Sequence, residues 1–415
     1  MSTLFSFFYI YDPWFFHFFR MAFFVGLIAA VMMLIKLYRN EFKAGISIPL
    51  DSLYAILGLL VISVIPMLIY RSNDFSVVTM YSKLLILFGF GVIGYNLFYR
   101  QQNSQQKLIA DLKIGIVIQW IVGVAALLGL PFMVDFALSS NVNMPRFFGS
   151  EQEYRLYNIT SAAFFQLSIF FLFLLHFLLA YNEKHNNISS VFLFFILCIG
   201  LISGRTFLLL SVVSILLYFK WRYLPVLFIF AGMILLLAMY LPDNRYVAHA
   251  LEPLINLLTM VDKSLIHSVN EVTEATQLSS STDTLLEEHL YMPQLKQILF
   301  GDGFYFTEDG RYYGFTDSGF IRQVLYGGIG YMLACFAFTA YFVWKVAQNW
   351  FNGSWKFTLS TLAILSICNI KADTYAFPGI MFVLIIFLSL FVEKNENTSG
   401  RNLILFCKQK DAKNV

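Results

Sequence analysis

The chain has 415 residues, of which 59% are hydrophobic and only 13% are charged. This composition excludes a soluble protein, because no soluble domain of this size needs so much apolar surface, whereas each membrane-spanning helix needs roughly 20 apolar residues. The net charge of +3 is too small to indicate a nucleic-acid partner. The sequence therefore predicts an all-α polytopic membrane protein that does not bind nucleic acid.

The first segment, residues 4–19, is rich in aromatic residues and is interrupted by Asp12-Pro13. It is either an additional membrane span or a helix that lies at the membrane interface. The segment lacks the basic start and the small-residue cleavage site of a cleaved signal peptide.

Eleven further apolar runs give a total of 11–12 predicted transmembrane helices. These runs lie near residues 21–38, 52–70, 77–99, 114–137, 161–181, 190–203, 206–219, 223–241, 319–345, 356–371 and 377–392. Basic residues in the connecting loops indicate the cytoplasmic side of the membrane. By this rule the cytoplasmic segments are 36–43, 99–113, 181–187, 219–225, 344–356 and the lysine-rich tail.

Arg205 is the only charged residue between Ser190 and Phe219. The charge pattern requires Lys184 and Lys220 to lie on the same side of the membrane. We therefore expect a hairpin whose arms have about 14 residues and are roughly 21 Å long, with a turn at Ser203–Thr206 below the outer surface. A single long helix is the alternative, and it would reverse the orientation of every later loop.

Residues 242–318 form one large external loop in this topology, with 12 acidic and 4 basic residues. Apolar residues at helical spacing predict an amphipathic helix from about 249 to 269, and a second helix is expected around 284–299. The predicted organisation is four parts. They are N-terminal membrane helices including the Arg205 hairpin (1–241), the external loop domain (242–318), C-terminal membrane helices (319–392) and a cytoplasmic tail (393–415).

No spacing in the sequence predicts a metal site or a cofactor. The four cysteines show no CxxC or His-Cys spacing, and the histidines of the external loop are scattered. His176 lies in an apolar run and is interpreted as a buried, hydrogen-bonded histidine. There is no phosphate-binding glycine loop, no GxSxG motif and no DxD pair.

Arginine and lysine are distributed differently along the chain. The predicted cytoplasmic segments hold 12 of the 16 lysines but only 4 of the 12 arginines. Arginine offers a bidentate fork that suits phosphate oxygens, and it keeps its charge when partly desolvated. The outer face therefore indicates an anionic, phosphorylated ligand, although arginines also pair with carboxylates and lipid head groups. The eight outer arginines are Arg20, Arg71, Arg146, Arg155, Arg205, Arg245, Arg311 and Arg322.

Each candidate site has a structural alternative. Arg205 is either an anion clamp or an arginine that caps the turn or pairs with a carboxylate, and no acidic residue lies within the hairpin itself. Arg146, Arg155 and Asn158 precede the fifth span and either bind the ligand or belong to an ordinary solvated loop.

A glycine-rich segment ends at Asp317, beside a span that begins with Arg322 and contains Gly327–Gly330. Asp317 is either the N-cap of that helix or a general base for a sugar hydroxyl. The glycines are expected to permit close helix packing.

The order and placement of these features resemble the bacterial O-antigen polymerase family and, more distantly, the O-antigen ligases. The resemblance covers most of the chain, through short and degenerate motifs. It is carried by the large late external loop, by "SGRT" in mid-chain, by "RFFG…YN" before the fifth span and by "FGDGFYF…TDSGFIRQVLYGGIGY".

The resemblance implies a metal-independent membrane glycosyltransferase of the C-type class, in the bacterial inner membrane with its active site facing the periplasm. Such an enzyme transfers a growing glycan from undecaprenyl pyrophosphate to the non-reducing end of a lipid-linked repeat unit. Donor and acceptor would thus be undecaprenyl-pyrophosphate-linked oligosaccharides. Membrane lipids and a membrane protein that regulates chain length are further expected partners, and no cofactor is expected.

The family pattern also implies roles for individual residues. Arg205 would stabilise the departing pyrophosphate, and Asp317, or no residue at all, would receive the acceptor proton. The substrate-binding positions would be Arg146 and, as weaker candidates, Arg155, Asn158, Arg311 and Arg322.

Two other functions stay open. The ligases have a histidine near the start of the span that holds the GxxG motif, whereas Thr316-Asp317 occupies that region here, which favours a polymerase. A flippase for lipid-linked oligosaccharides would also need cationic groups in the membrane. Transporters often have pseudo-symmetric halves, and this sequence has a large one-sided loop and no visible repeat.

Overall fold

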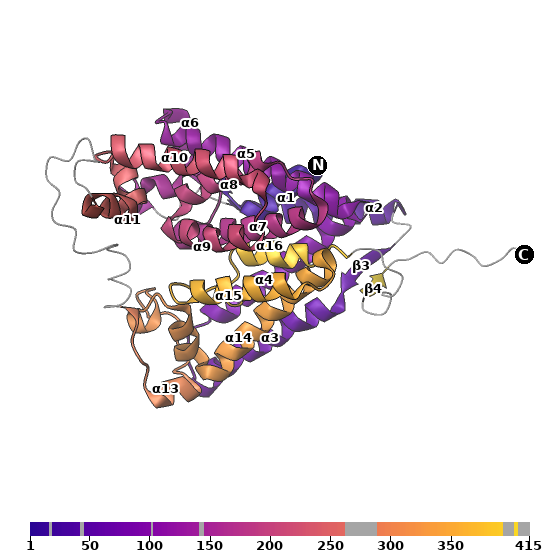
Figure 1. The fold of residues 1–415 in the computed structure, drawn as a ribbon. Helices are drawn as coiled ribbons and strands as arrows, with labels where there is room; N and C mark the ends of the chain where they lie inside the picture. The colour runs from indigo at the N-terminus through magenta and orange to yellow at the C-terminus, as the bar shows by residue number, and fades with distance from the viewer. Residues whose placement is uncertain are drawn as a thin grey trace, which may run out of the picture. The chain divides into compact units, whose positions relative to one another are not determined.

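The computed structural model describes residues 1–15, 19–41, 45–100, 103–140, 145–261, 289–392 and 402–405, and these are mostly helical (Figure 1). Seven helical segments in this described part are long and apolar enough to cross a membrane. The chain is therefore an all-α polytopic membrane protein. The seven are α2 (Met21–Tyr38), α3 (Leu50–Tyr70), α4 with η1 (Ser76–Gly94 and Tyr95–Tyr99), α5 (Ser104–Leu127), α7 (Phe164–His185), η4 with α10 (Trp221–Tyr223 and Leu224–Tyr240) and α14 (Gly319–Phe351).

Other apolar runs form shorter helices, so seven full-length candidates stand where 11–12 spans were expected. Hydropathy alone does not register the helix breaks at Asp12, at Gly204 and between residues 370 and 379. The shorter helices are α1 (Ser2–Tyr11), α8 (Ser190–Ser203), α9 (Arg205–Leu217), α15 (Trp355–Asn369) and α16 (Ile380–Leu388).

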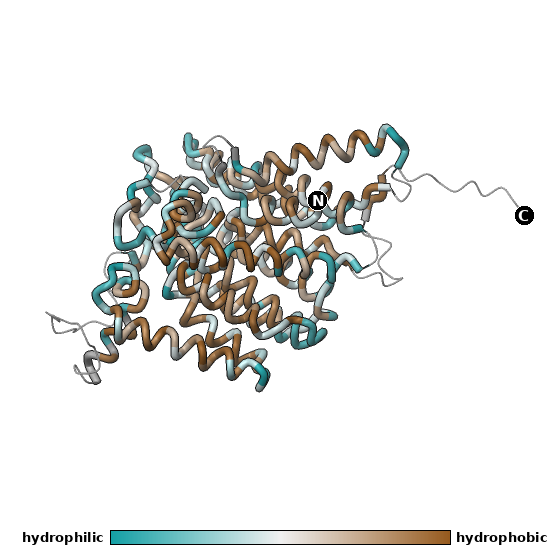
Figure 2. Tube along the Cα trace, turned by 90° about the horizontal axis from the view of Figure 1, so that it is seen from above, coloured by the Kyte–Doolittle hydropathy of each residue, from teal (hydrophilic) through white to brown (hydrophobic). Residues whose placement is uncertain are grey.

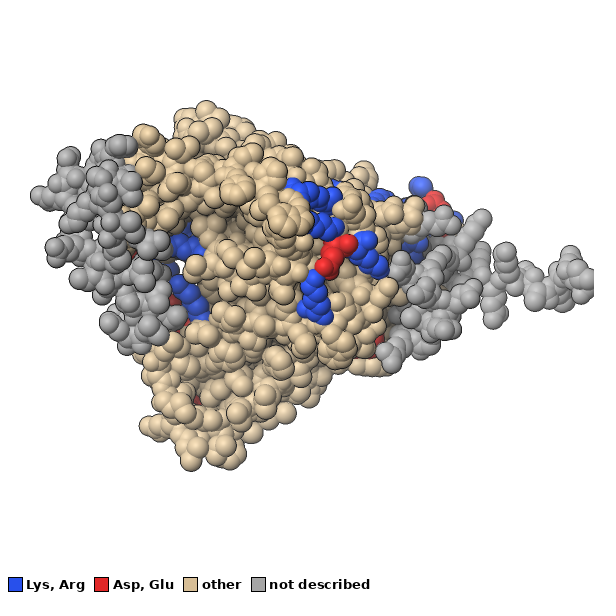
Figure 3. Space-filling view, in the orientation of Figure 1, with Lys and Arg blue, Asp and Glu red and all other residues tan. Residues whose placement is uncertain are grey.

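The remaining elements are short and lie mostly in the connections. They are β1 (Trp14–Phe15), β2 (Phe19–Arg20), β3 (Ile46–Pro49), α6 (Pro131–Ser140), η2 (Pro145–Phe147), η3 (Glu153–Leu156), α11 (Arg245–Val261), α13 (Leu295–Phe300), η7 (Tyr313–Phe315) and β4 (Asn402–Leu405). Strands β3 and β4 pair antiparallel, with Ile46 opposite Leu405. Hydrophobic residues run along the helices while hydrophilic ones gather at their ends and in the loops (Figure 2). The face in Figure 3 shows few charged side chains, as a bilayer requires.

The chain divides into two compact units, which are described separately. Unit 1 comprises Met1–Asp12, Phe19–Leu112 and Met292–Val415, and unit 2 comprises Pro13–Phe18 and Lys113–Tyr291. The first and last membrane helices thus share unit 1, whereas the Arg205 hairpin and α11 belong to unit 2. The predicted four-part organisation divided the chain at other positions, and residues 262–288 of the predicted loop domain lie outside the described residues.

In unit 1, α14 packs against α3, α13 and α15, and α3 and α14 run side by side in Figure 1. The helix α14 is broken at Gly327 and Gly328, of which Gly328 has φ 73°. The break exposes carbonyl groups that would otherwise accept bonds within the helix. The chain after α13 satisfies them, because the N–H groups of Asp302 and Gly303 donate to the carbonyls of Leu325 (2.6 Å) and Tyr326 (3.0 Å).

In unit 2, α8 and α9 form a hairpin packed on α7. The break falls at Gly204, inside the predicted turn. The segment that follows α9 is held at the end of α7 and at the connection between α7 and α8. There Lys220 Nζ donates to the carbonyl of Asn182 (2.5 Å) and Arg222 donates to the carbonyl of Ile188 (3.2 Å). His176 of α7 is buried, and its Nδ1 lies 3.0 Å from Ser214 Oγ, as expected for a hydrogen-bonded core histidine.

Candidate functional site

Arg205 is the first residue of α9 and lies where the apolar hairpin turns. Its Nη1 forms an ion pair with Oε2 of Glu252 on α11, and the two side chains are 17% and 25% exposed. The absence of an acidic residue within the hairpin therefore did not mean that Arg205 lacks a carboxylate. Neither side chain of the pair is fully buried.

Arg155 of η3 lies directly against the same turn. Its Nε donates to the carbonyl of Ser203 (3.2 Å), and its guanidinium lies 4.4 Å from the ring centre of Phe164. Burial, together with the charge of Arg205, lowers the pKa of Arg155 to about 10. Two guanidinium groups thus meet at one turn, where they disfavour each other's charge and favour an anion between them.

Gly204 is the residue that allows this arrangement. Its backbone has φ 152° and ψ 161°, a region that only glycine occupies easily. A Cβ at this position would lie 2.8 Å from Ser168 Oγ and 2.9 Å from Arg155 Nη2. The "SGRT" sequence therefore serves to bring Arg155 onto the backbone next to Arg205.

The helix α11 contacts this region through its first two helical turns, from Arg245 to Glu252. The hydroxyl of Tyr154 lies 3.0 Å from His249 Nδ1, and Arg245 donates to the carbonyl of Gly149 (3.1 Å). Burial, and then the charges of Arg205 and Arg155, lowers the pKa of His249 to about 4. The histidine is therefore neutral near pH 7. The predicted amphipathic helix is α11, which begins at Arg245, a few residues earlier than the pattern suggested.

The other two candidates of unit 2 lie elsewhere in it. Arg146 is exposed on η2, with its guanidinium 4.8 Å from the ring centre of Phe147. Asn158 is completely buried, and its side-chain amide has no hydrogen-bond partner among the described residues. It lies beside α5, near Gly123.

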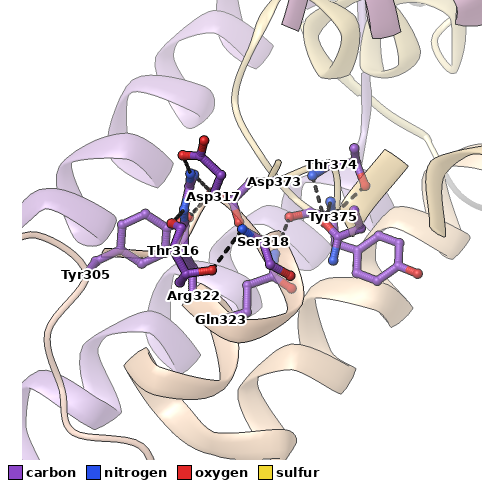
Figure 4. Close-up of polar contacts among 10 residues, drawn as sticks. Tyr305, Thr316, Asp317, Ser318, Arg322, Gln323, Asp373, Thr374 and Tyr375 are labelled. Atoms are coloured by element: carbon purple, nitrogen blue, oxygen red, sulfur yellow. Dashed lines mark hydrogen bonds and ion pairs between the residues drawn. The ribbon is translucent and has the colours of Figure 1, made fainter. Parts of the chain in front are cut away.

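Arg322 of unit 1 is at the centre of a second polar cluster (Figure 4). Its side chain is only 4% exposed, and its guanidinium stacks 3.2 Å from the ring centre of Tyr312. The donors Nε, Nη1 and Nη2 bond to the carbonyl of Thr316 (2.9 Å), to Asp373 Oδ2 (2.8 Å) and to Asp317 Oδ1 (3.0 Å). Arg322 was expected to bind substrate, but its guanidinium is buried and bonds to groups of the protein itself.

Asp317 is the accessible member of this cluster. Its side chain is 53% exposed, although its neighbours Thr316 and Ser318 are each buried. The N-cap of α14 is Ser318, so Asp317 does not hold the capping position that the sequence left open. Its carboxylate bonds to Arg322 instead. Arg311 lies apart on an exposed turn, where its carbonyl accepts from the N–H of Thr307 (2.8 Å).

Asp74, in the connection between α3 and α4, holds the loop between α13 and α14 in place. Oδ2 of Asp74 accepts from the N–H groups of Tyr305 (2.7 Å) and Phe306 (2.9 Å). Burial acts to raise the pKa of Asp74, but these bonds and those from Ser76 outweigh it and lower the pKa. The carboxylate therefore stays ionised at neutral pH and keeps the loop in position.

Sequence reasoning missed Glu252 and Asp373. Both carboxylates neutralise an arginine that is 47 or 51 positions away, so no local spacing connects them. For Asp373 a signal did exist, because an acidic residue between two apolar runs is rarely left without a partner. Lys371, two positions earlier, makes the segment look like an ordinary solvated loop.

The two clusters differ in charge. In unit 2, Arg155 and Arg205 face Glu252 among the residues that the structure describes, which leaves one positive charge and suits an anionic group. In unit 1, Arg322 faces Asp317 and Asp373, which leaves one negative charge and an exposed carboxylate. Among the described residues, no group of three or more His, Cys, Asp and Glu side chains could hold a metal ion.

No family model matches this chain, and neither a curated protein nor a solved structure matches it significantly.

Proposed function

We propose that this chain is a membrane glycosyltransferase of the C-type class that polymerises a surface polysaccharide, the O-antigen, at the periplasmic face of the bacterial inner membrane. It would transfer the growing glycan from undecaprenyl pyrophosphate to the non-reducing end of a lipid-linked repeat unit. The observation that carries the proposal is the pair Arg155 and Arg205 at the turn of an otherwise apolar hairpin. The motif resemblance described above supplies the substrate class.

The pyrophosphate of the donor would bind at this turn. The turn lies at the start of α9, and a helix N-terminus favours an anion. Glu252 stands where a phosphate oxygen would lie, so the ligand would take over its contact with Arg205. As the glycosidic bond to pyrophosphate breaks, the two guanidinium groups would stabilise the charge that builds on the leaving group.

The motif resemblance gives Asp317 the role of general base for the acceptor. A sugar hydroxyl attacks the anomeric carbon of the donor, the carbon–oxygen bond to pyrophosphate breaks, and the hydroxyl proton moves to Asp317. The exposed carboxylate in a cluster with net negative charge supports this role. The exposed Arg146 and Arg311 remain proposed contacts to the anionic substrate.

The test is complementation of a strain in which the gene for this chain is deleted, read as the lipopolysaccharide ladder on a gel. A core with a single repeat unit after deletion supports a polymerase. We expect Arg205→Ala to be unable to restore the ladder at near-normal protein abundance, and the exposed Arg39→Ala to restore it.

Other patterns would overturn the proposal. A core without any repeat unit, together with long lipid-linked chains, would mean a ligase. Single lipid-linked units that accumulate on the cytoplasmic side would mean a flippase. A full ladder with Arg205→Ala would exclude the clamp, and loss of the protein would assign Arg205 a structural role.

A further inference from the structure

We infer that Asp373 and Arg322 form a positioning pair that holds Asp317 for proton transfer, and that Arg322 does not itself contact substrate. This inference rests on the proposed function and adds Asp373, to which the motif resemblance gives no role. It follows from the way that one buried guanidinium connects a buried carboxylate to an exposed one (Figure 4).

Arg322 is closed to a ligand by burial, because its side chain is only 4% exposed. Its three donor nitrogens each bond within unit 1, and Tyr312 covers the guanidinium plane at 3.2 Å. An arginine that clamps a phosphate presents two parallel N–H groups to the ligand. Arg322 presents no such pair to the outside, because its side chain is buried and its Nη1 and Nη2 are each directed at a carboxylate of unit 1.

Asp373 is the fixed end of the arrangement. It is 1% exposed, and its Oδ2 accepts from both Arg322 and the hydroxyl of Tyr305. Burial raises the pKa of Asp373 from its ordinary value, and the charge of Arg322 opposes that shift. Because arginine does not lose its proton in proteins, its burial here requires an ionised partner.

The backbone that carries Asp373 is held against the start of α14. The N–H of Thr374 donates to Asn369 Oδ1 (2.8 Å), and Gln323 donates to the carbonyl of Tyr375 (2.9 Å). Gly319 makes the approach possible, because a Cβ there would lie 2.8 Å from the Cα of Asp373. These contacts hold Asp373 in place, and with it the guanidinium that it anchors.

Asp317 takes its position from this anchor. Its backbone lies between two buried residues, and Oδ1 is held by Arg322 at 3.0 Å. The groups that face it include Arg322 from α14, Asp373 from the loop after α15, and Tyr312 from the loop before α14. Because Arg322 divides its charge between two carboxylates, Asp317 is oriented without being fully neutralised.

Asp373→Asn tests this coupling, because asparagine keeps the shape and an acceptor but removes the charge. All of the charge of Arg322 then acts on Asp317, stabilises its ionised form and makes it a weaker base. With lipid-linked repeat units extracted from the deletion strain as substrate, we expect kcat to fall roughly tenfold to a hundredfold. KM should stay unchanged, and the acid limb of the pH–rate profile should move to lower pH. Asp373→Glu should restore part of kcat.

Arg322→Lys separates positioning from substrate binding. Lysine keeps the charge but lacks the planar fork that directs N–H groups at two carboxylates at once. A loss of kcat at constant KM supports the inference, whereas a higher KM at constant kcat means that Arg322 binds substrate and overturns it.

A second readout does not depend on activity. A water-soluble carbodiimide labels protonated carboxyl groups, and the pH midpoint of labelling at Asp317 can be followed by mass spectrometry, with the exposed Asp309 as internal reference. A lower midpoint at Asp317 in Asp373→Asn supports the coupling, and an unchanged midpoint overturns it. If the wild-type chain does not polymerise, the proposed function fails, and the labelling still decides whether Asp373 controls the protonation of Asp317.

Discussion

Gly328 of α14 packs its Cα directly against the backbone carbonyl of Leu299 at the end of α13, with no room for a Cβ between them. Gly301 repeats the relationship from the other side, since a Cβ there would lie 2.7 Å from the backbone of Tyr326 and Gly327. The glycines of "FGDG" and "YGGIG" thus fit backbone against backbone. They hold the loop that leads to Asp317 at the break in α14.

Gly328→Ala should therefore destabilise unit 1 strongly. The φ of 73° and the overlap with Leu299 together should cost about 3 kcal/mol. Thermal unfolding of the purified protein in detergent measures the effect. The control is Gly330→Ala in the same helix, where a Cβ meets nothing within 4 Å. Equal melting temperatures for both variants would contradict the packing described here.

Gly204→Ala should affect the anion cluster more than the rest of unit 2. Alanine strains the backbone at φ 152° and forces Arg155 away from the turn, at a cost of about 2 kcal/mol. We expect loss of chain growth in the ladder assay while protein remains detectable. Gly232→Ala in α10, where a Cβ has open space, serves as the control, and an intact ladder with Gly204→Ala would refute this account.

Glu252→Gln should raise the affinity for inorganic pyrophosphate. The substitution removes the carboxylate that competes for Arg205, and a gain of roughly fivefold to tenfold corresponds to about 1 to 1.4 kcal/mol. Isothermal titration calorimetry on the purified chain measures it. Glu151→Gln, at an exposed position of unit 2, should leave the affinity unchanged. Weaker binding in Glu252→Gln would show that the carboxylate supports the ligand site instead of occupying it.

The contact between α11 and Tyr154 should depend on pH. The pKa of His249 lies near 4 when α11 is in place, below the ordinary value of 6.5, so the undocked helix binds protons more readily. The contact is then complete above pH 6.5 and weakens as pH falls towards 4. Hydrogen exchange of residues 245–252, corrected for intrinsic rates, should show this loss of protection. His249→Gln should remove the pH dependence, and protection that is constant from pH 7 to 4 would disprove it.

The sequence predicted those features that depend on neighbouring residues. The long apolar runs became α2, α3 and α7, and "SGRT" marked the break between α8 and α9. The N-terminal run was ambiguous because its end depends on Asp12, whose left-handed backbone and bonds to Arg20 and Ala22 terminate α1 after ten residues.

The carboxylates that pair with Arg205 and Arg322 could not be predicted from neighbouring positions in the sequence. Arg205 and Glu252, like Arg322 and Asp373, meet only because separate helices pack together. Charge counting along the chain left Arg322 as one more outer cation, although burial between two carboxylates gives it a different role. Periodicity predicts which face of a helix is apolar, but it does not predict which polar group from another helix lies opposite.

The pairing of β3 with β4 imposes an order of events on biosynthesis. Ile46 leaves the ribosome early, but its partner Leu405 follows more than 350 residues later. At about 5–20 residues per second that interval is roughly 20 to 70 s, during which the intervening membrane helices are inserted. During that time the backbone of β3 lacks its hydrogen bonds to β4. The small sheet therefore forms only after the intervening membrane helices have been synthesised.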